Sequence, residues 1–284
     1  MKRLLTIITL MACITTAYAQ RQVPVPARIM TFNIRTENKG DGRNNWEMRF
    51  QKVATLIVKE KSDIVCLQEV RHRQLTDLLS QLEDYSYVGV GRDNGKEGGE
   101  YNPVLFKKDR FNLLRSGTFW LSPTPQKPSF GWGAAYRRIA TWAILQDKET
   151  MKSIIVLNTH LDNASQEARA NGAALIKERL SRMNNELPVV ITGDMNAESD
   201  NPAYTKMTSA MFPMQDASKT GKQAKGPEYT FHAFGQLPAD KRKKVDYIFV
   251  SDQVNVKKSQ IYDSHLGEGI YLSDHNALSA DIVY

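Results

Sequence analysis

Short runs of β-branched and aromatic residues alternate along the chain with segments whose apolar residues recur at helical spacing. The runs predict strands, at residues 27–34, 63–70, 85–90, 102–108, 139–145, 153–161, 188–192, 244–250, 254–263 and 276–283. The helical spacing predicts helices, at residues 45–62, 74–82 and 165–183. Many strands with a few helices between them, and no internal repeat, indicate two packed sheets with helices outside.

The first twenty residues follow a different pattern. A basic start and an apolar run over residues 2–12 precede the sequence AYAQ at 17–20, whose small residues suit signal-peptidase cleavage. This pattern is typical of a secretory signal peptide and is too short to span a bilayer. We therefore expect residues 1–19 to be a signal peptide and the protein to be exported, to the periplasm or the medium. Lipid attachment at Cys13 is the weaker alternative, because the flanking residues suit it poorly.

The remainder, residues 20–284, is predicted to form a single domain, because no linker or low-complexity run interrupts it. Its only cysteine is Cys66, so the fold does not depend on a disulfide. The formal net charge of +7 suits an anionic substrate. The basic run KRKK at 241–244 is expected to be a solvated turn rather than a phosphate site. No further segment is apolar enough to span a membrane, and a monomer is expected, although the sequence does not report the oligomeric state.

Polar residues gather at the ends of the predicted strands. Asp194 and Asn196 follow the strand at 188–192 and, with Met195 between them, would share one face. Asn33, Glu69, His160 and Asp162 likewise follow or end an apolar run. Asp246 lies within the strand at 244–250, and Asp274 and His275 precede the strand at 276–283. A single such residue is commonly a turn former. A set of carboxylates, amides and imidazoles is harder to explain as turns, because polar groups beside an apolar core are costly unless something there uses them.

The motifs that carry these residues occur in a recognisable order. They are TFNIR, LQEV, NTHLD, GDMNA, VDYIFV and SDHNALSA. Together they resemble the endonuclease/exonuclease/phosphatase superfamily, which includes pancreatic-type deoxyribonucleases, inositol polyphosphate 5-phosphatases and neutral sphingomyelinases. The resemblance covers about residues 27–284. It implies an α/β fold, a four-layered sandwich of two central mixed β-sheets flanked by helices, and hydrolysis of phosphate esters with a divalent metal.

The resemblance also implies roles for single residues. Asn33, Glu69 and Asp274 match the metal-site positions, and hard oxygen ligands suit Mg²⁺, with Mn²⁺ as an alternative. Asp194 would orient or deprotonate the attacking water, and Asn196 would donate to the phosphate. His275 would contact phosphate or handle a proton, with Asp246 as the partner that fixes its tautomer.

Other residues are expected to act on the leaving group or the rest of the substrate. By similarity to the pancreatic-type deoxyribonucleases, His160 would pair with Glu100 and protonate the leaving group. Arg138 is similar to an arginine that reaches phosphate in this superfamily. His232 could line the pocket, and Trp132, in a Gly/aromatic loop, could stack on a ring or base; a merely packed tryptophan is an equal alternative. His72 and His265 are expected at the surface.

Two hypotheses from different classes remain for the function. The first is an exported, metal-dependent phosphoesterase, acting either on small sugar, inositol or lipid-headgroup phosphates or, as a nuclease, on DNA or RNA. The second is a non-catalytic module that keeps the fold to bind a phosphorylated ligand. The second predicts that several of the core positions are lost, and all of them are present in this chain.

Overall fold

The computed structural model describes residues 24–183 and 186–284. The predicted signal peptide, its cleavage site and Cys13 lie outside the described residues. Within the described part of the chain, no helix has the length and apolar character needed to cross a membrane.

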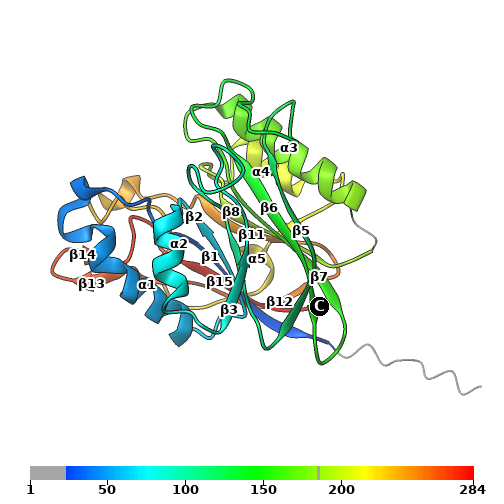
Figure 1. Ribbon diagram of the computed structural model, residues 1–284, viewed down its shortest axis with the longest axis horizontal. Helices are drawn as coiled ribbons and strands as arrows, with labels where there is room; N and C mark the ends of the chain where they lie inside the picture. Colours follow the sequence, from blue (N-terminus) through cyan, green and yellow to red (C-terminus); the bar gives the residue numbers. More distant parts are fainter. Residues whose placement is uncertain (1–23, 184–185) are drawn as a thin grey trace, which may run out of the picture.

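Two large β-sheets form the centre of the molecule (Figure 1). Within the described residues the first has the order β10 (Lys222–Gln223), β12 (Asn255–Ile261), β15 (Leu278–Val283), β1 (Pro26–Asn33), β2 (Ile64–Gln68), β4 (Val104–Lys107) and β3 (Tyr85–Val88). The second has the order β5 (Phe111–Trp120), β6 (Ile139–Asp147), β7 (Ser153–His160), β8 (Val189–Asp194), β11 (Asp246–Val250) and β9 (Gln215–Asp216). Both sheets mix parallel and antiparallel pairs.

Helices cover the outer faces of both sheets (Figure 1). The first sheet packs against α1 (Trp46–Lys59) and α2 (His72–Leu79), and the second against α3 (Gln166–Met183) and α4 (Pro202–Thr208). The remaining elements are short: η1 (Lys39–Asn44), α5 (Ala217–Thr220), η2 (Ala239–Lys241), β13 (His265–Gly267) and β14 (Ile270–Tyr271). The predicted four-layered α/β sandwich is therefore confirmed.

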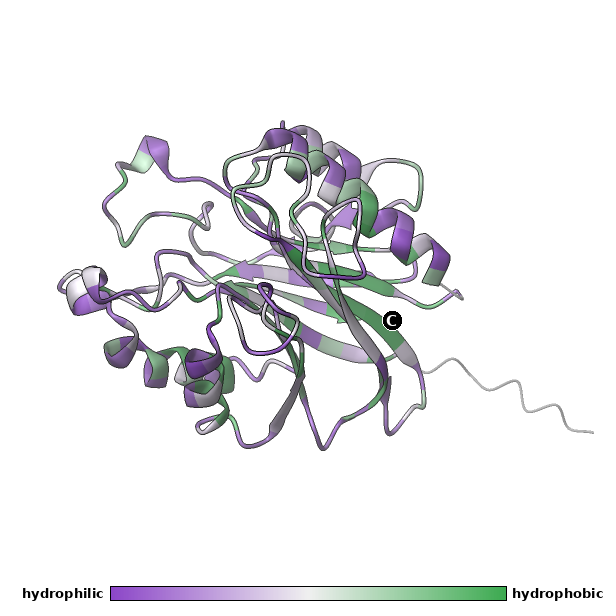
Figure 2. Cartoon of the chain, turned by 45° about the horizontal axis from the view of Figure 1, so that its top comes forward, coloured by the Kyte–Doolittle hydropathy of each residue, from purple (hydrophilic) through white to green (hydrophobic). Residues whose placement is uncertain are grey.

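The space between the sheets is apolar along most of its length and polar at one end. Alternation along each strand sends every second side chain inward. In β1 and β8 the inward residues Ile29 and Val190 belong to the inter-sheet core, and further along the same faces come Asn33 and Asp194. Figure 2 shows hydrophobic residues along the central strands and hydrophilic residues along the helices and loops. The polar residues at this end mark the place where the apolar core gives way to the site.

A layer of buried amides separates the apolar core from the polar end. Asn158 of β7 donates from Nδ2 to the carbonyl oxygens of Leu67 (2.7 Å) and Pro103 (2.8 Å), so it links the two sheets. Its Oδ1 accepts from Gln68 Nε2 at 2.7 Å, and Gln68 also donates to the hydroxyl of Thr31. Because buried amides are stable only when they are hydrogen-bonded, this layer fixes the relative position of the two sheets next to the site.

Most predicted elements exist within a few residues of their expected bounds, but β5, α4 and several elements of two to four residues were missed. The long edge strand β5 has an exposed middle section without alternation, so its pattern resembles a loop. The short helix α4 begins at the N-cap Asn201, whose side chain accepts from the amide of Ala203. The lone cysteine of the described residues, Cys66, is free and buried, as expected.

Candidate active site

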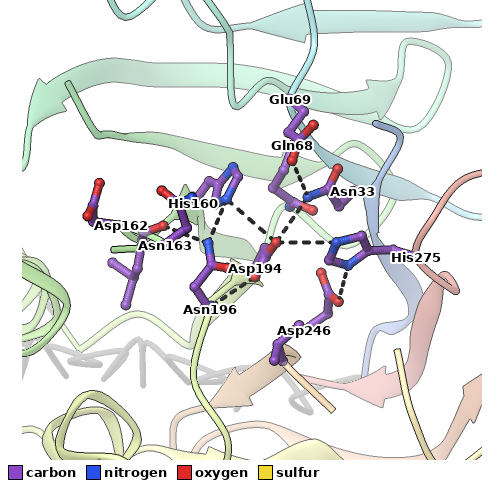
Figure 3. A network of polar contacts seen from close by, with 12 residues as sticks. Asn33, Gln68, Glu69, His160, Asp162, Asn163, Asp194, Asn196, Asp246 and His275 are labelled. Atoms are coloured by element: carbon purple, nitrogen blue, oxygen red, sulfur yellow. Dashed lines mark hydrogen bonds and ion pairs between the residues drawn. The ribbon is translucent and has the colours of Figure 1, made fainter. Parts of the chain in front are cut away.

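Strand register brings the polar strand ends to one edge of the sandwich. In the parallel pair β7/β8, His160 lies opposite Asp194, and in the antiparallel pair β8/β11, Asp194 lies opposite Asp246. Asn33 ends β1 in the facing sheet, and its Nδ2 donates across the gap to Asp194 Oδ2 at 3.0 Å. Figure 3 shows these side chains converging from both sheets. The residues that the sequence predicted from separate motifs therefore meet at one place.

Local backbone geometry ends the strands and turns the chain at this edge. Gly193, with φ of +150°, passes the backbone of β7 so closely that a Cβ there would lie 2.0 Å from the carbonyl oxygen of Thr159. Glu69 and Asn196 adopt positive φ values of 62° and 46°, which are uncommon for residues other than glycine. Met195 points away from the site into the core under α3, as the alternation predicted.

Asn196 holds both neighbouring catalytic candidates. Its backbone amide donates to Asp194 Oδ1 at 2.8 Å, and its Nδ2 contacts Leu161 O at 3.0 Å and His160 Nε2 at 2.9 Å. Both amide hydrogens are thus in use, so the expected donation from Asn196 to phosphate would require one of these bonds to open. In this structure Asn196 positions His160 and fixes its tautomer, with Nε2 as the acceptor.

His275 and Asp246 form the predicted pair, with His275 Nδ1 at 2.8 Å from Asp246 Oδ2. Burial alone would lower the pKa of this imidazole, but the charges of Asp246, Asp194 and Asp274 raise it to about 10. The ring is therefore an imidazolium at neutral pH. Its Nε2 lies 3.7 Å from Asp194 Oδ2, which places a positive charge beside that carboxylate.

The pKa values of Asp194 and His160 are shifted so that both groups favour their neutral forms. Burial, together with the charge of Asp246, raises the pKa of Asp194 to about 7, although His275 and two hydrogen bonds partly oppose this shift. Burial and the nearby charges of Arg138 and Arg92 lower the pKa of His160 well below its ordinary value, so this ring is neutral. A carboxylate that titrates near neutral pH is suited to act as a general base.

Glu69 and Asp274 supply two carboxylates on the other side of the cavity. Glu69 accepts from Asn33 Nδ2 (3.1 Å) and from the amide of Thr36 (2.9 Å), and Arg35 Nε lies 4.0 Å from Asp274 Oδ2. Burial raises the pKa of Asp274, and the charge of Glu69 adds to this increase. Glu69 and Asp274 repel one another and offer hard oxygen donors at the cavity wall. Such a pair of carboxylates suits a divalent cation. Asn33 orients Glu69 here, while its Oδ1 accepts from the amide of Arg35 at 3.0 Å.

A second group could also hold an ion. Ligand atoms of Asp194, Asp246 and His275 lie within 4.8 Å of one another and all three residues are buried. This group differs from the predicted set of Asn33, Glu69 and Asp274. In this group the charged imidazole of His275 already compensates the two carboxylates.

The predicted pairing of His160 with Glu100 is absent. Glu100 Oε2 instead lies 2.6 Å from Arg92 Nη1, and both side chains are about nine-tenths buried. Nδ1 of His160 is buried and has no hydrogen-bond partner within the described residues. The sequence could not show that Glu100 pairs with Arg92 instead of His160, because Arg92 lies in a loop whose position depends on tertiary packing.

Arg138 lines the cavity as expected, held by two neighbours that follow β7. Its Nε lies 3.2 Å from Asp162 Oδ2, and its Nη2 donates to Asn163 Oδ1 at 2.9 Å. Asp162 also accepts from the backbone amides of Ala135, Ala164 and Ser165, so it joins the loop that carries Arg138 to the start of α3. Asp162 therefore positions the arginine rather than facing the cavity.

Two predicted substrate-binding residues lie outside the cavity. Trp132 is not among its lining residues, and its carbonyl oxygen accepts from the hydroxyl of Ser165. His232 is buried and lines a separate cavity: its Nδ1 accepts from the amide of Gly235 at 3.0 Å, so its Nε2 donates to Ser264 Oγ at 2.8 Å. The backbone amide of His232 donates to the carbonyl oxygen of Asp274. His232 thus supports the segment that carries His275. His72 and His265 are exposed, as expected.

The cavity has a volume of about 440 Å³ and includes residues that the sequence did not indicate. Arg92, Tyr136 and Asn163 line one side, and Phe231 and Lys243 line the other. Lys243 belongs to the basic run at 241–244, which was expected to be a solvated turn, and it lies 3.0 Å from Glu198. Loop residues of this kind carry no periodic signal, which explains why pattern analysis missed them.

The family model described as "Endonuclease/Exonuclease/phosphatase family" matches residues 30–275. The chain belongs to this family. Its members are hydrolases, which supports hydrolysis of phosphoric esters as the reaction class, and a divalent metal fits both the family and the acidic groups of the site.

Solved structures and curated relatives extend this likeness over nearly the whole chain. A family member from Bacteroides vulgatus is 42% identical, with a TM-score of 0.88 over 91% of this chain and 98% of the other. A mannosyl-6-phosphatase from Bacteroides thetaiotaomicron is 29% identical, with a TM-score of 0.84 over 91% of this chain and all of the other. Human nocturnin is 26% identical over 91% of this chain, but the match spans only 65% of nocturnin.

Proposed function

We propose that this protein is an exported, Mg²⁺- or Mn²⁺-dependent phosphoesterase that hydrolyses a phosphate ester of a small molecule. The observation that carries the proposal is the joint position of Asp194, His275 and Glu69 on one 440 Å³ cavity. A general base, a charged donor and a metal-binding acid within one small space are the requirements for attack of water on a phosphate ester.

Each residue has a defined part in this chemistry. A divalent cation held by Glu69 and Asp274 would offset the negative charge of the phosphate oxygens and favour deprotonation of water. Asp194, with its raised pKa, accepts the proton of the attacking water. His275, kept charged by Asp246, donates from Nε2 to a phosphate oxygen. The neutral ring of His160 lies beside the leaving oxygen, and Arg138 contacts the phosphate.

The shape of the site favours a small substrate. A cavity of about 440 Å³ is in the range that suits compact ligands. The relative named as a mannosyl-6-phosphatase aligns over its full length and supports a phosphomonoester as substrate. A nuclease remains the second candidate, because nocturnin relatives match most of this chain and cationic residues line the cavity mouth.

The test compares hydrolysis of 4-nitrophenyl phosphate and bis(4-nitrophenyl) phosphate by the purified protein, with Mg²⁺, with Mn²⁺ and with EDTA. We expect metal-dependent turnover, and a reduction in kcat/KM of about 10³-fold in Asp194→Asn, because loss of a positioned base typically costs 10²- to 10⁴-fold. The control Asp252→Asn removes an exposed carboxylate away from the cavity and should behave like the wild type.

Two outcomes would overturn the proposal. Full metal-dependent turnover in Asp194→Asn would remove Asp194 from the reaction. Binding of these phosphate esters without turnover under any metal condition would instead support the non-catalytic binding module.

A further inference from the structure

One wall of the cavity holds polar groups that the hydrolytic reaction does not use. Arg92 and Glu100 form an ion pair there, and Tyr136 lies beside them. Arg92 lies near His160, since the charges of Arg138 and Arg92 both lower the pKa of that ring. If His160 faces the leaving oxygen, the alcohol part of the substrate extends towards this wall.

The ion pair leaves hydrogen-bonding capacity unused. It engages one oxygen of Glu100 and one nitrogen of Arg92, whereas a carboxylate offers two oxygens and a guanidinium offers five N–H groups. Arg92 Nε is buried and has no partner in the described part of the chain. Because this nitrogen is enclosed, the groups open to a ligand are the second oxygen of Glu100 and the terminal nitrogens of Arg92, since both residues line the cavity.

The chemistry of the pair selects among ligands. A second phosphate or carboxylate would be attracted by Arg92 but repelled by Glu100, whose own pKa is raised by burial despite Arg92. A hydroxyl group both donates and accepts. Neighbouring hydroxyls on a ring can therefore donate to the carboxylate and accept from the guanidinium at the same time, which neither an anion nor an apolar group can do.

Tyr136 adds a flat surface at the mouth. The residue is 51% exposed, and the guanidinium carbons of Arg92 and Arg138 lie 5.0 Å and 5.5 Å from the centre of its ring. The loop that carries it is fixed: Gly131 has no room for a Cβ, which would lie 2.4 Å from the carbonyl oxygen of Leu121, and Ala135 donates to Asp162. A rigid, half-exposed ring costs little conformational entropy when a ligand packs against it.

We propose that Arg92, Glu100 and Tyr136 form a subsite for the alcohol part of the substrate, and that this part is a hydroxyl-rich ring, so that the substrate class is a sugar phosphomonoester. The proposal rests on the proposed function, because it takes the hydrolytic site as its neighbour. Arg92 and Glu100 bind the ring hydroxyls, and Tyr136 packs against the face of the ring.

The experiment compares two sugar phosphates with a phosphomonoester whose ring has neither hydroxyl groups nor a ring oxygen. Glucose 6-phosphate and mannose 6-phosphate carry the ring hydroxyls, and cyclohexylmethyl phosphate has a ring of similar size without them. The wild type should prefer a sugar phosphate by at least tenfold in kcat/KM. Glu100→Gln and Arg92→Met should reduce that preference at least tenfold, and Tyr136→Leu should raise KM for both substrates.

Matched controls separate this role from general damage. Phe130 is as exposed as Tyr136 and belongs to the same loop but does not line the cavity, so Phe130→Leu should keep the wild-type preference. Arg115 is a cationic residue of β5 outside the cavity, and Arg115→Met controls for loss of a guanidinium. Because Arg92 and Glu100 are a buried pair whose separation could unfold the protein, the exposed Tyr136 provides a variant that leaves the core intact.

The failures of the two proposals are distinguishable. If no phosphate ester is hydrolysed, the proposed function fails. If hydrolysis is metal-dependent but the wild type does not prefer sugar phosphates, or Glu100→Gln leaves the preference intact, the subsite is overturned and the hydrolase stands. Faster turnover of a dinucleotide than of both sugar phosphates would also overturn it, in favour of a nucleic-acid substrate.

Discussion

At the residue scale, the protonation state of His275 depends on the charges around it. Asp246 contributes a hydrogen bond and a charge, and together with Asp194 and Asp274 it keeps the pKa of His275 at about 10. A raised imidazole pKa means that the ring stays charged across pH 5–9 in the metal-free protein. In Asp246→Asn the pKa of His275 should fall, because burial disfavours the charged ring and fewer negative charges then offset that effect.

NMR of the EDTA-treated protein measures this directly, by following the ring resonances of His275 between pH 5 and pH 9. We expect no titration in the wild type, whereas in Asp246→Asn the ring should lose its proton as the pH rises through this range. A wild-type His275 that titrates near pH 6.5 would contradict the assignment of a permanent charge.

The sequence predicted the residues on strand ends better than those in loops. Asn33, His160, Asp194 and Asp246 lie on strands, so alternation and register fix where they point. Arg92, Tyr136 and Lys243 lie in irregular segments whose place is set by packing against distant parts of the chain. For the same reason the sequence chose Trp132 instead of Tyr136, and Glu100 as the partner of His160.

At the element scale, one buried lysine joins the two helices on the second sheet. Lys177 of α3 is 1% exposed, and its Nζ donates to the carbonyl oxygens of Met207 (3.0 Å) and Ser209 (2.8 Å) at the end of α4. These are carbonyls that a helix C-terminus leaves without intrahelical partners. Burial lowers the pKa of Lys177 from 10.5 to about 8.

This shift gives a pH-dependent stability with a definite sign. Between pH 8 and pH 10.5 the unfolded chain binds more protons at Lys177 than the folded chain, so this residue's contribution to the unfolding free energy rises with pH. In Lys177→Met that contribution is gone. In denaturant unfolding, the unfolding free energy of the wild type relative to that of the variant should rise by about 1 to 3 kcal/mol from pH 8 to pH 10.

The exposed neighbour Lys206 of α4 supplies the control for loss of a lysine side chain, in Lys206→Met. A constant difference between wild type and Lys177→Met would mean that Lys177 is charged throughout the range. Of these two helices, α3 was predicted from the sequence to within one residue of its start. The helix α4 was missed because seven residues give too short a periodic signal.

At the scale of the whole molecule, the sandwich is apolar at one end of its inter-sheet space and acidic at the other. Acids at the site that repel one another reduce the stability of the metal-free fold, and a bound cation restores it by mass action. Asp274 tests this, because its raised pKa shows that its charge is unfavourable where it stands. Asp274→Asn should raise the melting temperature in EDTA by about 2 °C, from the usual relation between stability and Tm.

The same variant should lose much of the stabilisation that Mg²⁺ gives. At ten times its Kd, Mg²⁺ should stabilise the wild type by about 1.4 kcal/mol, and the gain in Asp274→Asn should be clearly smaller, because one ligand has lost its charge. Thermal unfolding with EDTA and over a Mg²⁺ titration measures both quantities, and Asp252→Asn, with its exposed carboxylate, should change neither. If Asp274→Asn melts at a lower temperature in EDTA and keeps the full Mg²⁺ gain, then Asp274 is a structural residue, and the buried group of Asp194, Asp246 and His275 becomes the better candidate for the metal.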